Sequence, residues 1–336
     1  MFAFIWSQSP TPDAIHDHPI ATHGLDRGCG QQGQLQDGTA QQVQGDGGCG
    51  ELVGYVDDGA YSYAHNDPII LSRVLTEKYN LLENWMNNNK LVINPDKTHM
   101  MVMGTRKVAP LRNQVSMMAG NFVIKPTETE KLLGGTIHQS LKFNQHLTDS
   151  RECLTTQLAN RINGLKKISH SAGFHTRLMV ANGAVLSKLV YLITVWGGAA
   201  QYLLKALQVQ QLNAARVVCG HQAVRWSRRQ LLKKVGWLSV RQLVFFHTFL
   251  QAHKTLTSGV PLPLHTALTT DQPYRTRSVA RGNIKLKQGY KSTSTFKYRA
   301  EQTYNCVPVD VKSGSLDAVK RKCKKWVLEN VPLDWS

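Results

Sequence analysis

Apolar residues recur with different periods along the chain, and these periods predict different elements. Between residues 51 and 138, apolar runs at 52–56, 100–103 and 117–123 have the length of strands or of a small hairpin. Between the first two runs, Leu71, Val74, Leu75, Leu82 and Trp85 recur at spacings of three, four and seven, as on one helix face. Asn66-Asp67-Pro68 supplies a capping residue and a proline suited to the first turn of that helix. We therefore expect a short antiparallel sheet with a packed helix.

Residues 139–258 have the pattern of a helical region. Four apolar stripes have helical spacing: Leu147, Leu154, Leu158, Ile162 and Leu165; Leu186, Leu189, Val190 and Ile193; Leu204, Leu207, Leu212 and Val217; and Leu243, Phe246, Phe249 and Leu250. Such stripes normally form a core, so no catalytic role is assigned to them. Strands followed by a run of helices predict the α+β class.

Two further regions complete the expected division of the chain. Residues 1–50 are rich in Gly, Gln, Asp and His and show no apolar periodicity after Trp6, which predicts disorder. Residues 259–336 are basic and loop-rich and end in a helix capped by Ser315. The expected regions are thus 1–50, 51–138, 139–258 and 259–336.

Charge is distributed unevenly along the 336 residues. Residues 1–60 contain one basic and eight acidic residues, which gives them a net charge of −7. Because the net charge of the whole chain is +18, residues 61–336 carry a net charge of +25. An excess of this size favours a polyanionic partner and predicts salt-dependent association. The alternative is a solvated basic surface that maintains solubility.

Cysteine usage and hydropathy exclude several classes of protein. Six dispersed cysteines without a Cys-x-x-Cys pair argue against a disulfide scaffold, and the apolar start of the chain is too short for a secretory signal. The long apolar stretch at 184–200 is interrupted by Lys188 and predicts a buried helix. His16, His18, His23 and Cys29 match no zinc-ligand spacing, so we interpret them as an incidental cluster. We expect an intracellular protein with no membrane partner.

Two adjacent carboxylates follow the first apolar run, in Tyr55-Val56-Asp57-Asp58. Neighbouring residues of an extended segment point to opposite faces, so one aspartate can face a reaction centre while the other supports the turn. Paired carboxylates of this kind hold Mg²⁺ for phosphoryl transfer. The alternative is an ordinary hairpin in which Asp-Gly supplies the turn.

Several motifs follow this turn in a fixed order. The predicted helix is succeeded by Asn94-Pro95-Asp96-Lys97-Thr98, a strand, and then Lys131-Leu132-Leu133-Gly134-Gly135-Thr136-Ile137. This order resembles the second half of the palm of reverse transcriptases from non-LTR retrotransposons. Trp196-Gly197-Gly198 and the segment 236–241 are similar to the helical C-terminal part of the same elements. The likeness extends over residues 51–331 and is strongest at 52–137.

The resemblance implies a partial polymerase palm, a helical thumb-like bundle and a basic C-terminal region. It implies Mg²⁺ bound by Asp57, with Asp58 in support, and Lys97 as proton donor to the pyrophosphate leaving group. Tyr55 and Val56 would then line the floor near the primer terminus. Gly134 and Gly135 would let the primer strand approach the backbone, although a tight turn explains glycines equally well. The implied partners are an RNA template with a DNA primer, or an RNA–DNA hybrid.

Cations and aromatic residues alternate between residues 274 and 299. The candidates for nucleic-acid binding are Arg275, Arg277, Arg281, Tyr290 and Phe296. Phosphates of a single strand would take the charges while its bases stack on the rings. The alternative is an exposed loop whose aromatic residues pack on the helices. The basic run at 320–325 fits a nuclear address, a phosphate contact or a solvated helix face.

Two-metal polymerisation also needs a second carboxylate on a neighbouring strand that faces the Asp-Asp turn. No such residue is recognisable, because Asp13, Asp17, Asp26, Asp37 and Asp46 all lie in polar sequence without an apolar strand. We therefore expect a truncated reverse-transcriptase-like protein that is catalytically incomplete and at most binds nucleic acid. Two alternatives remain: an active RNA-directed DNA polymerase completed by another chain or exon, and a helical scaffold protein.

Overall fold

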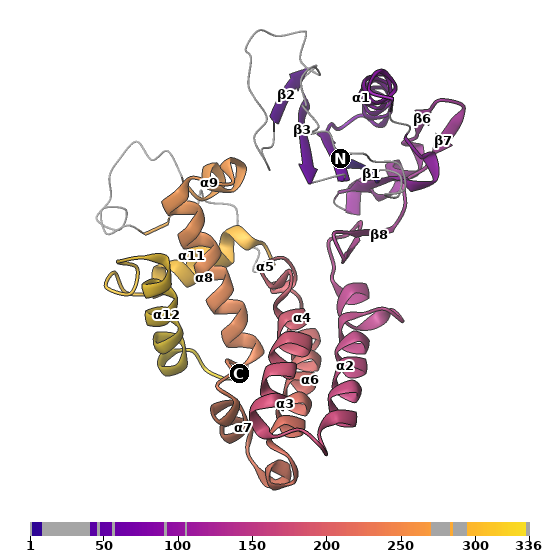
Figure 1. Ribbon diagram of the computed structural model, residues 1–336. Helices are drawn as coiled ribbons and strands as arrows, with labels where there is room; N and C mark the ends of the chain where they lie inside the picture. The colour runs from indigo at the N-terminus through magenta and orange to yellow at the C-terminus, as the bar shows by residue number, and fades with distance from the viewer. Residues whose placement is uncertain are drawn as a thin grey trace. The chain divides into compact units, whose positions relative to one another are not determined.

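A computed structural model gives the fold of residues 2–8, 41–45, 48–55, 58–90, 93–104, 106–269, 283–284 and 294–333. The chain forms two compact units, Met1–Lys142 and Phe143–Ser336, which we call the N-terminal unit and the helical unit (Figure 1). The structure is mostly helical with small antiparallel sheets, so the α+β class is confirmed. The segments expected as 139–258 and 259–336 belong to one unit.

The N-terminal unit contains a five-stranded antiparallel sheet. Its strands are β1 (Phe2–Gln8), β2 (Gln41–Gly45), β3 (Gly48–Tyr55), β4 (Asp58–Ala64) and β5 (Thr98–Met103), in the spatial order β2-β3-β4-β1-β5. Residues 2–8, 41–45 and 48–50, which composition assigns to a disordered segment, form strands in the structure. For β1, the apolar run Phe2-Ala3-Phe4-Ile5-Trp6 is long enough for an interior strand that pairs with β4 and β5.

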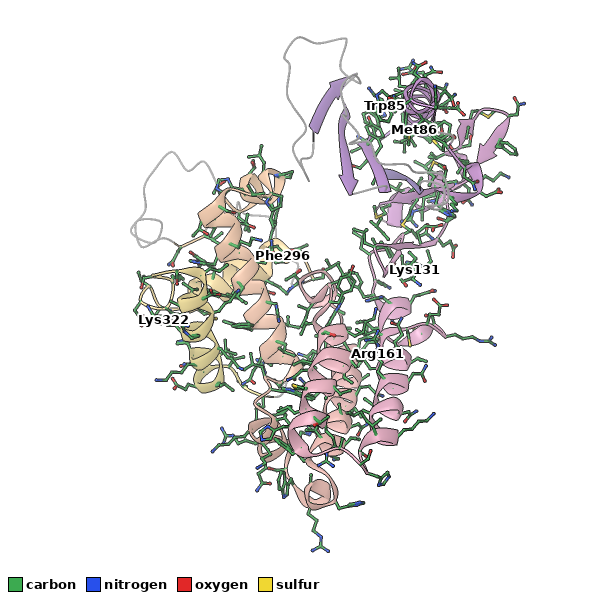
Figure 2. The ribbon with its side chains drawn as sticks, viewed as in Figure 1. Trp85, Met86, Lys131, Arg161, Phe296 and Lys322 are labelled. Carbon is green, nitrogen blue, oxygen red and sulfur yellow. The ribbon has the colours of Figure 1, made fainter. Side chains whose placement is uncertain are left out.

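Helix α1 (Pro68–Asn88) packs against the N-terminal unit's core through the predicted face. The Asp67 carboxylate accepts from the backbone N–H of Ile69 at 2.8 Å, and Pro68 opens the helix. Leu71, Val74, Leu75 and Tyr79 are buried. Their core partners include Tyr63, Met100, Val102 and Met117. Trp85 and Met86, labelled in Figure 2, lie in its last turn.

Two small hairpins follow the sheet. The 3₁₀ segments η1 (Pro95–Lys97) and η2 (Arg106–Gln114) flank β5, and η2 leads to the hairpin of β6 (Met117–Ala119) and β7 (Phe122–Ile124). Its turn falls at Gly120-Asn121, as predicted, with Gly120 at φ +56°. The Ser72 and Thr76 hydroxyls of α1 accept from the backbone N–H groups of Ser116 and Met118. Strands β8 (Thr129–Leu132) and β9 (Gly135–His138) form the second hairpin.

The helical unit is built from short and long helices. Its elements are η3 (Gln145–Asp149), α2 (Leu154–Ile168), α3 (Phe174–Ala181), η4 (Asn182–Leu186), α4 (Ser187–Val190), α5 (Ile193–Trp196), α6 (Gln201–Cys219), η5 (His221–Arg225), α7 (Arg228–Val235), α8 (Val240–Ser258), α9 (Leu262–Leu268), α11 (Phe296–Cys306) and α12 (Leu316–Asn330). Three of the predicted stripes lie on α2, α6 and α8. The second stripe is divided between η4, α4 and α5, because Leu192 adopts φ +55° and interrupts the helix.

A glutamine network holds three helices of this unit in register. Gln208 and Gln211 of α6 are buried and bonded to each other, and Gln211 Nε2 donates to the Leu238 carbonyl at 2.8 Å. Gln242 of α8 donates through Nε2 to the Val331 carbonyl at 2.8 Å, just beyond α12. Because each amide is satisfied inside the core, the network favours one arrangement of these helices.

The Trp196-Gly197-Gly198 motif is explained by close packing. Trp196 is fully buried, and its indole N–H donates to the Tyr191 carbonyl at 2.9 Å. The Arg299 guanidinium lies directly over Gly198 and donates to the carbonyls of Ser294 and Thr194, both at 2.6 Å. A side chain at position 198 would occupy the space of that guanidinium. The second glycine is thus a packing residue.

Candidate functional site

The Asp-Asp motif lies at one end of the five-stranded sheet. Strands β3 and β4 form a hairpin with Tyr55 opposite Asp58, so Asp58 and Gly59 belong to β4 and do not supply the turn as an ordinary Asp-Gly hairpin would require. The connecting residues Val56 and Asp57 lie outside the described part of the chain. Asp58 is the first residue of β4, so its backbone position is fixed by the ladder.

Strand β1 is the neighbour from which a second carboxylate would have to face this motif. Its register pairs Gln8 with Asp58 and Ser7 with Gly59. Residues directly opposite in an antiparallel pair project from the same face and have Cβ atoms about 5 Å apart. The position that faces Asp58 is therefore occupied by an amide. Sequence reasoning missed this strand, and the apolar run 2–6 was the signal that identifies it.

Lys97 lies at the same end of the sheet, on the other side of β1. Ser7 pairs with Thr98, the residue after Lys97. The side-chain oxygen of Asn94 accepts a hydrogen bond from the backbone N–H of Asp96 at 2.9 Å. The backbone carbonyl of Asn94 accepts one from the N–H of Lys97 at 3.1 Å. This turn explains the Asn-Pro-Asp-Lys sequence and places Lys97, half-exposed, two strands from Asp58.

Gly134 lies in a hairpin turn, and Gly135 is the first residue of the strand that follows it. Leu132 pairs with Gly135, which leaves Leu133 and Gly134 as the two central residues with φ of +46° and +76°. Two-residue turns of the type favoured in hairpins require these positive angles. The run 131–137 therefore forms a hairpin, and its turn is a sufficient reason for Gly134. Lys131, labelled in Figure 2, lies on β8.

The register at this end of the sheet does not pair Asp58 with a second carboxylate residue on β1. Mg²⁺ prefers carboxylate oxygens in octahedral geometry, and a two-ion clamp needs carboxylates from both sides. In the register of the sheet, Gln8 of β1 is the partner of Asp58 of β4, so the paired position on β1 does not carry a carboxylate residue. Among the described residues, no group of three or more His, Cys, Asp or Glu side chains is suited to a metal ion. We derive no catalytic step through Mg²⁺.

The candidates for nucleic-acid binding are only partly described. Arg275, Arg277, Arg281 and Tyr290 lie outside the described residues. Phe296 begins α11 and is half-buried against the core of the helical unit (Figure 2). For this residue the packing agrees with the alternative interpretation, in which the aromatic rings pack on the helices.

The two units differ strongly in charge. Residues 1–142 contain 11 Lys and Arg against 14 Asp and Glu, a net charge of −3. Residues 143–336 contain 29 Lys and Arg against 8 Asp and Glu, a net charge of +21. Helix α7 contributes Arg228, Arg229, Lys233 and Lys234 to this excess and contains no acidic residue. Sequence reasoning missed α7, although Ser227 and Gln230 form a capping box that marks its start.

Comparisons with known proteins leave the chain without an assigned family. No model of a known protein family matches the sequence, and no curated protein matches it either. Within the residues that the structure covers, no helix combines the length and the apolar character needed to cross a bilayer.

Proposed function

We propose that this chain is a reverse-transcriptase-like protein of retrotransposon origin that binds nucleic acid and does not polymerise it on its own. The charge of the helical unit carries the proposal. A net charge of +21 within 194 residues, beside a unit of net charge −3, favours a polyanionic partner for the helical unit. Phosphates neutralised by Lys and Arg release counterions, which provides affinity without sequence readout.

The order of elements supports the proposed lineage. An Asp-Asp hairpin, helix α1, the Asn94 turn into β5 and the hairpins β6–β7 and β8–β9 follow one another, and helices come next. This is the order of motifs on which the resemblance to non-LTR reverse transcriptases rests.

The proposed lack of polymerase activity rests on the end of β1. Clamping two metal ions across the primer oxygen and the incoming phosphate requires carboxylates from neighbouring strands. Gln8 stands opposite Asp58, and an amide oxygen carries no charge to balance a second cation. Asp57 and Asp58 alone would hold at most one Mg²⁺ ion, which would supply electrostatic stabilisation of a phosphate.

Primer extension tests the enzymatic part of the proposal. The full chain is incubated with Mg²⁺ or Mn²⁺, a DNA primer and an RNA template, beside the Asp57→Ala variant. We expect no extended product from either protein. Extension by the unmodified chain that disappears in Asp57→Ala would establish an active polymerase instead.

Binding to an RNA–DNA hybrid tests the partner. We expect the affinity to fall steeply as NaCl rises from about 50 to 200 mM, because each neutralised phosphate contributes about 0.7–0.9 to the salt slope. An affinity that is independent of salt, or no binding at low salt, would favour the scaffold alternative.

A further inference from the structure

Helix α7 presents a row of cations on one side. Its apolar residues Leu231, Leu232 and Val235 are buried, and Arg229 and Lys233 are exposed one turn apart. Among the described residues, neither of these two cations forms an ion pair. The row is therefore open to an anionic partner.

Helix α12 presents a second row. Lys320 pairs with Asp317 at 3.3 Å, and Lys322 Nζ donates to the carbonyls of Asp310 and Ser313, so these two lysines have internal partners. Arg321 and Lys325 stand one turn apart and are exposed, with no ion pair in the part of the chain that the structure describes.

A hydrogen bond brings the two rows together. Lys324 Nζ of α12 donates to the carbonyl of Gly236 at the end of α7, at 3.3 Å. Gly236 follows Arg229 by seven residues and Lys233 by three, so all three share one side of α7. Lys324 lies three residues after Arg321 and directly before Lys325. In Figure 1, α7 leads directly into the lower end of α8, and α12 runs alongside α8. We call this combined surface the α7–α12 face.

The chemistry of the α7–α12 face selects among polyanions. The apolar side of α12 is buried through Val319, Cys323 and Val327, and Trp326 stacks on Phe245 at 5.7 Å. The helix thus has no free apolar side to insert into a bilayer. Among the described residues of α7 and α12, no aromatic side chain is classed as exposed, so the described part of the face offers no ring on which an unpaired base would stack. Phosphate contact without stacking suits a duplex, whose bases are already paired.

We propose that the α7–α12 face binds the sugar-phosphate backbone of duplex nucleic acid without reading its sequence. This inference rests on the proposed nucleic-acid-binding function and assigns it to a particular surface. It also separates this surface from the 274–299 segment, where interleaved aromatic residues suit a single strand.

The test compares two variants of the full chain with equal loss of charge. The first replaces Arg229, Lys233, Arg321 and Lys325 with Gln, and leaves Lys324 and Lys322 in place because they hold the fold together. The control also introduces Gln at four positions, and replaces exposed cations that lie outside the α7–α12 face: Lys142, Arg151, Lys205 and Lys254. Binding of a short DNA duplex and of a single strand is measured by fluorescence anisotropy across a salt series. Thermal unfolding confirms that both variants are folded.

We expect the first variant to lose about tenfold or more in duplex affinity and about three units of salt slope, since up to four phosphate contacts disappear. The control variant should lose less than about one unit of salt slope. In the first variant, the affinity for a single strand should change less than the affinity for the duplex.

Equal losses in both variants would overturn the inference and leave the proposed function intact, because net charge alone would then explain binding. Absence of binding by the unmodified chain would refute the proposed function itself. Face-dependent binding to phosphatidylserine vesicles without duplex binding would identify a membrane surface as the partner.

Discussion

At the scale of single residues, close contacts explain features that resemble functional motifs. Gly198 belongs to the sequence Trp196-Gly197-Gly198, and it leaves room for the guanidinium of Arg299. Burial lowers the pKa of Arg299 to about 10. The charge is retained at neutral pH, and two backbone carbonyls accept its hydrogen bonds.

Replacing Gly198 with Ala should destabilise the helical unit by about 2 kcal/mol or more, because the methyl group would displace Arg299 or the Ser294 carbonyl. Gly164→Ala is the matched control. Gly164 lies inside α2 with open space around it, and alanine there should stabilise by about 0.5–1 kcal/mol. Urea unfolding measures both changes. Equal stability of the two variants would show that the Gly198 contact is unimportant.

His146 should make the stability of the helical unit depend on pH. Burial, with a smaller effect of Lys188, lowers its pKa from 6.5 to about 4. Between pH 4 and pH 6.5, His146 binds a proton more strongly in the unfolded chain than in the folded protein. The free energy of unfolding therefore has its full value above pH 6.5 and decreases as the pH falls toward 4. The loss amounts to about 3 kcal/mol at most.

His146→Gln should flatten this dependence in unfolding experiments between pH 4 and 7. The exposed His170 provides the control, and His170→Gln should leave the curve unchanged. Burial also lowers the pKa values of His247 and His253, so a part of the slope should remain. An unchanged slope in His146→Gln would contradict the assignment.

At the scale of elements, β1 is the strand on which the N-terminal sheet depends. It lies between β4 and β5, with Ile5 opposite both Tyr61 and Met100. Strand β2 lies at the edge and pairs only with β3. A proline removes a backbone N–H from the ladder, so it should destabilise the N-terminal unit more in β1 than in β2.

Ile5→Pro should destabilise the N-terminal unit by about 3 kcal/mol or more, whereas Val43→Pro in β2 should cost about 1 kcal/mol. Chemical unfolding followed by circular dichroism distinguishes the two outcomes. If Ile5→Pro had no effect, residues 1–50 would be dispensable, as their composition alone suggests.

A carboxylate at position 8 should create a cation site at the end of the sheet. In Gln8→Asp, the paired positions 8 and 58 would both be aspartates, with Cβ atoms about 5 Å apart as in any directly opposite pair, and Asp57 is adjacent to Asp58 in the sequence. We expect tenfold or greater tightening of Mn²⁺ binding by calorimetry. Gln44→Asp in β2 changes the net charge equally and should bind Mn²⁺ no better than the unmodified chain. If the double variant Gln8→Asp with Asp58→Asn binds Mn²⁺ no more tightly than the unmodified chain, the site lies between these two positions.

Periodicity predicted the long elements and missed the short ones. Helix α1 and the stripe of α2 follow from residues that recur every three or four positions, and the caps at Asp67 and Ser315 are local signals. Strand β1 was missed because its pairing partners lie about 60 and 100 residues away. The interruption at Leu192 depends on tertiary packing and has no sequence signal. Likewise, only the sheet register reveals that Gln8 faces Asp58.

At the scale of the whole molecule, the separation of charge dominates. Like charges within the helical unit repel one another, and its net charge of +21 makes that repulsion large at low ionic strength. Salt shortens the range of the repulsion from about 30 Å at 0.01 M to about 10 Å at 0.1 M.

Raising NaCl over this range should increase the melting temperature of the helical unit by a few degrees. The N-terminal unit, with its net charge of −3, serves as the internal control and should change little. Scanning calorimetry resolves the two transitions. Equal shifts of both would indicate a general effect of salt on proteins.

The hydrogen bond between Gln242 and Val331 joins residues separated by 89 positions. Chain closure over such a distance is slow compared with helix formation, and α12 is synthesised after α6, α7 and α8. Helices α6 to α8 therefore form and pack before α12 arrives. On a nascent chain, the α7–α12 face is absent until α12 has been synthesised. Until then, the cations of α7 lack the second row that completes the proposed duplex-binding surface.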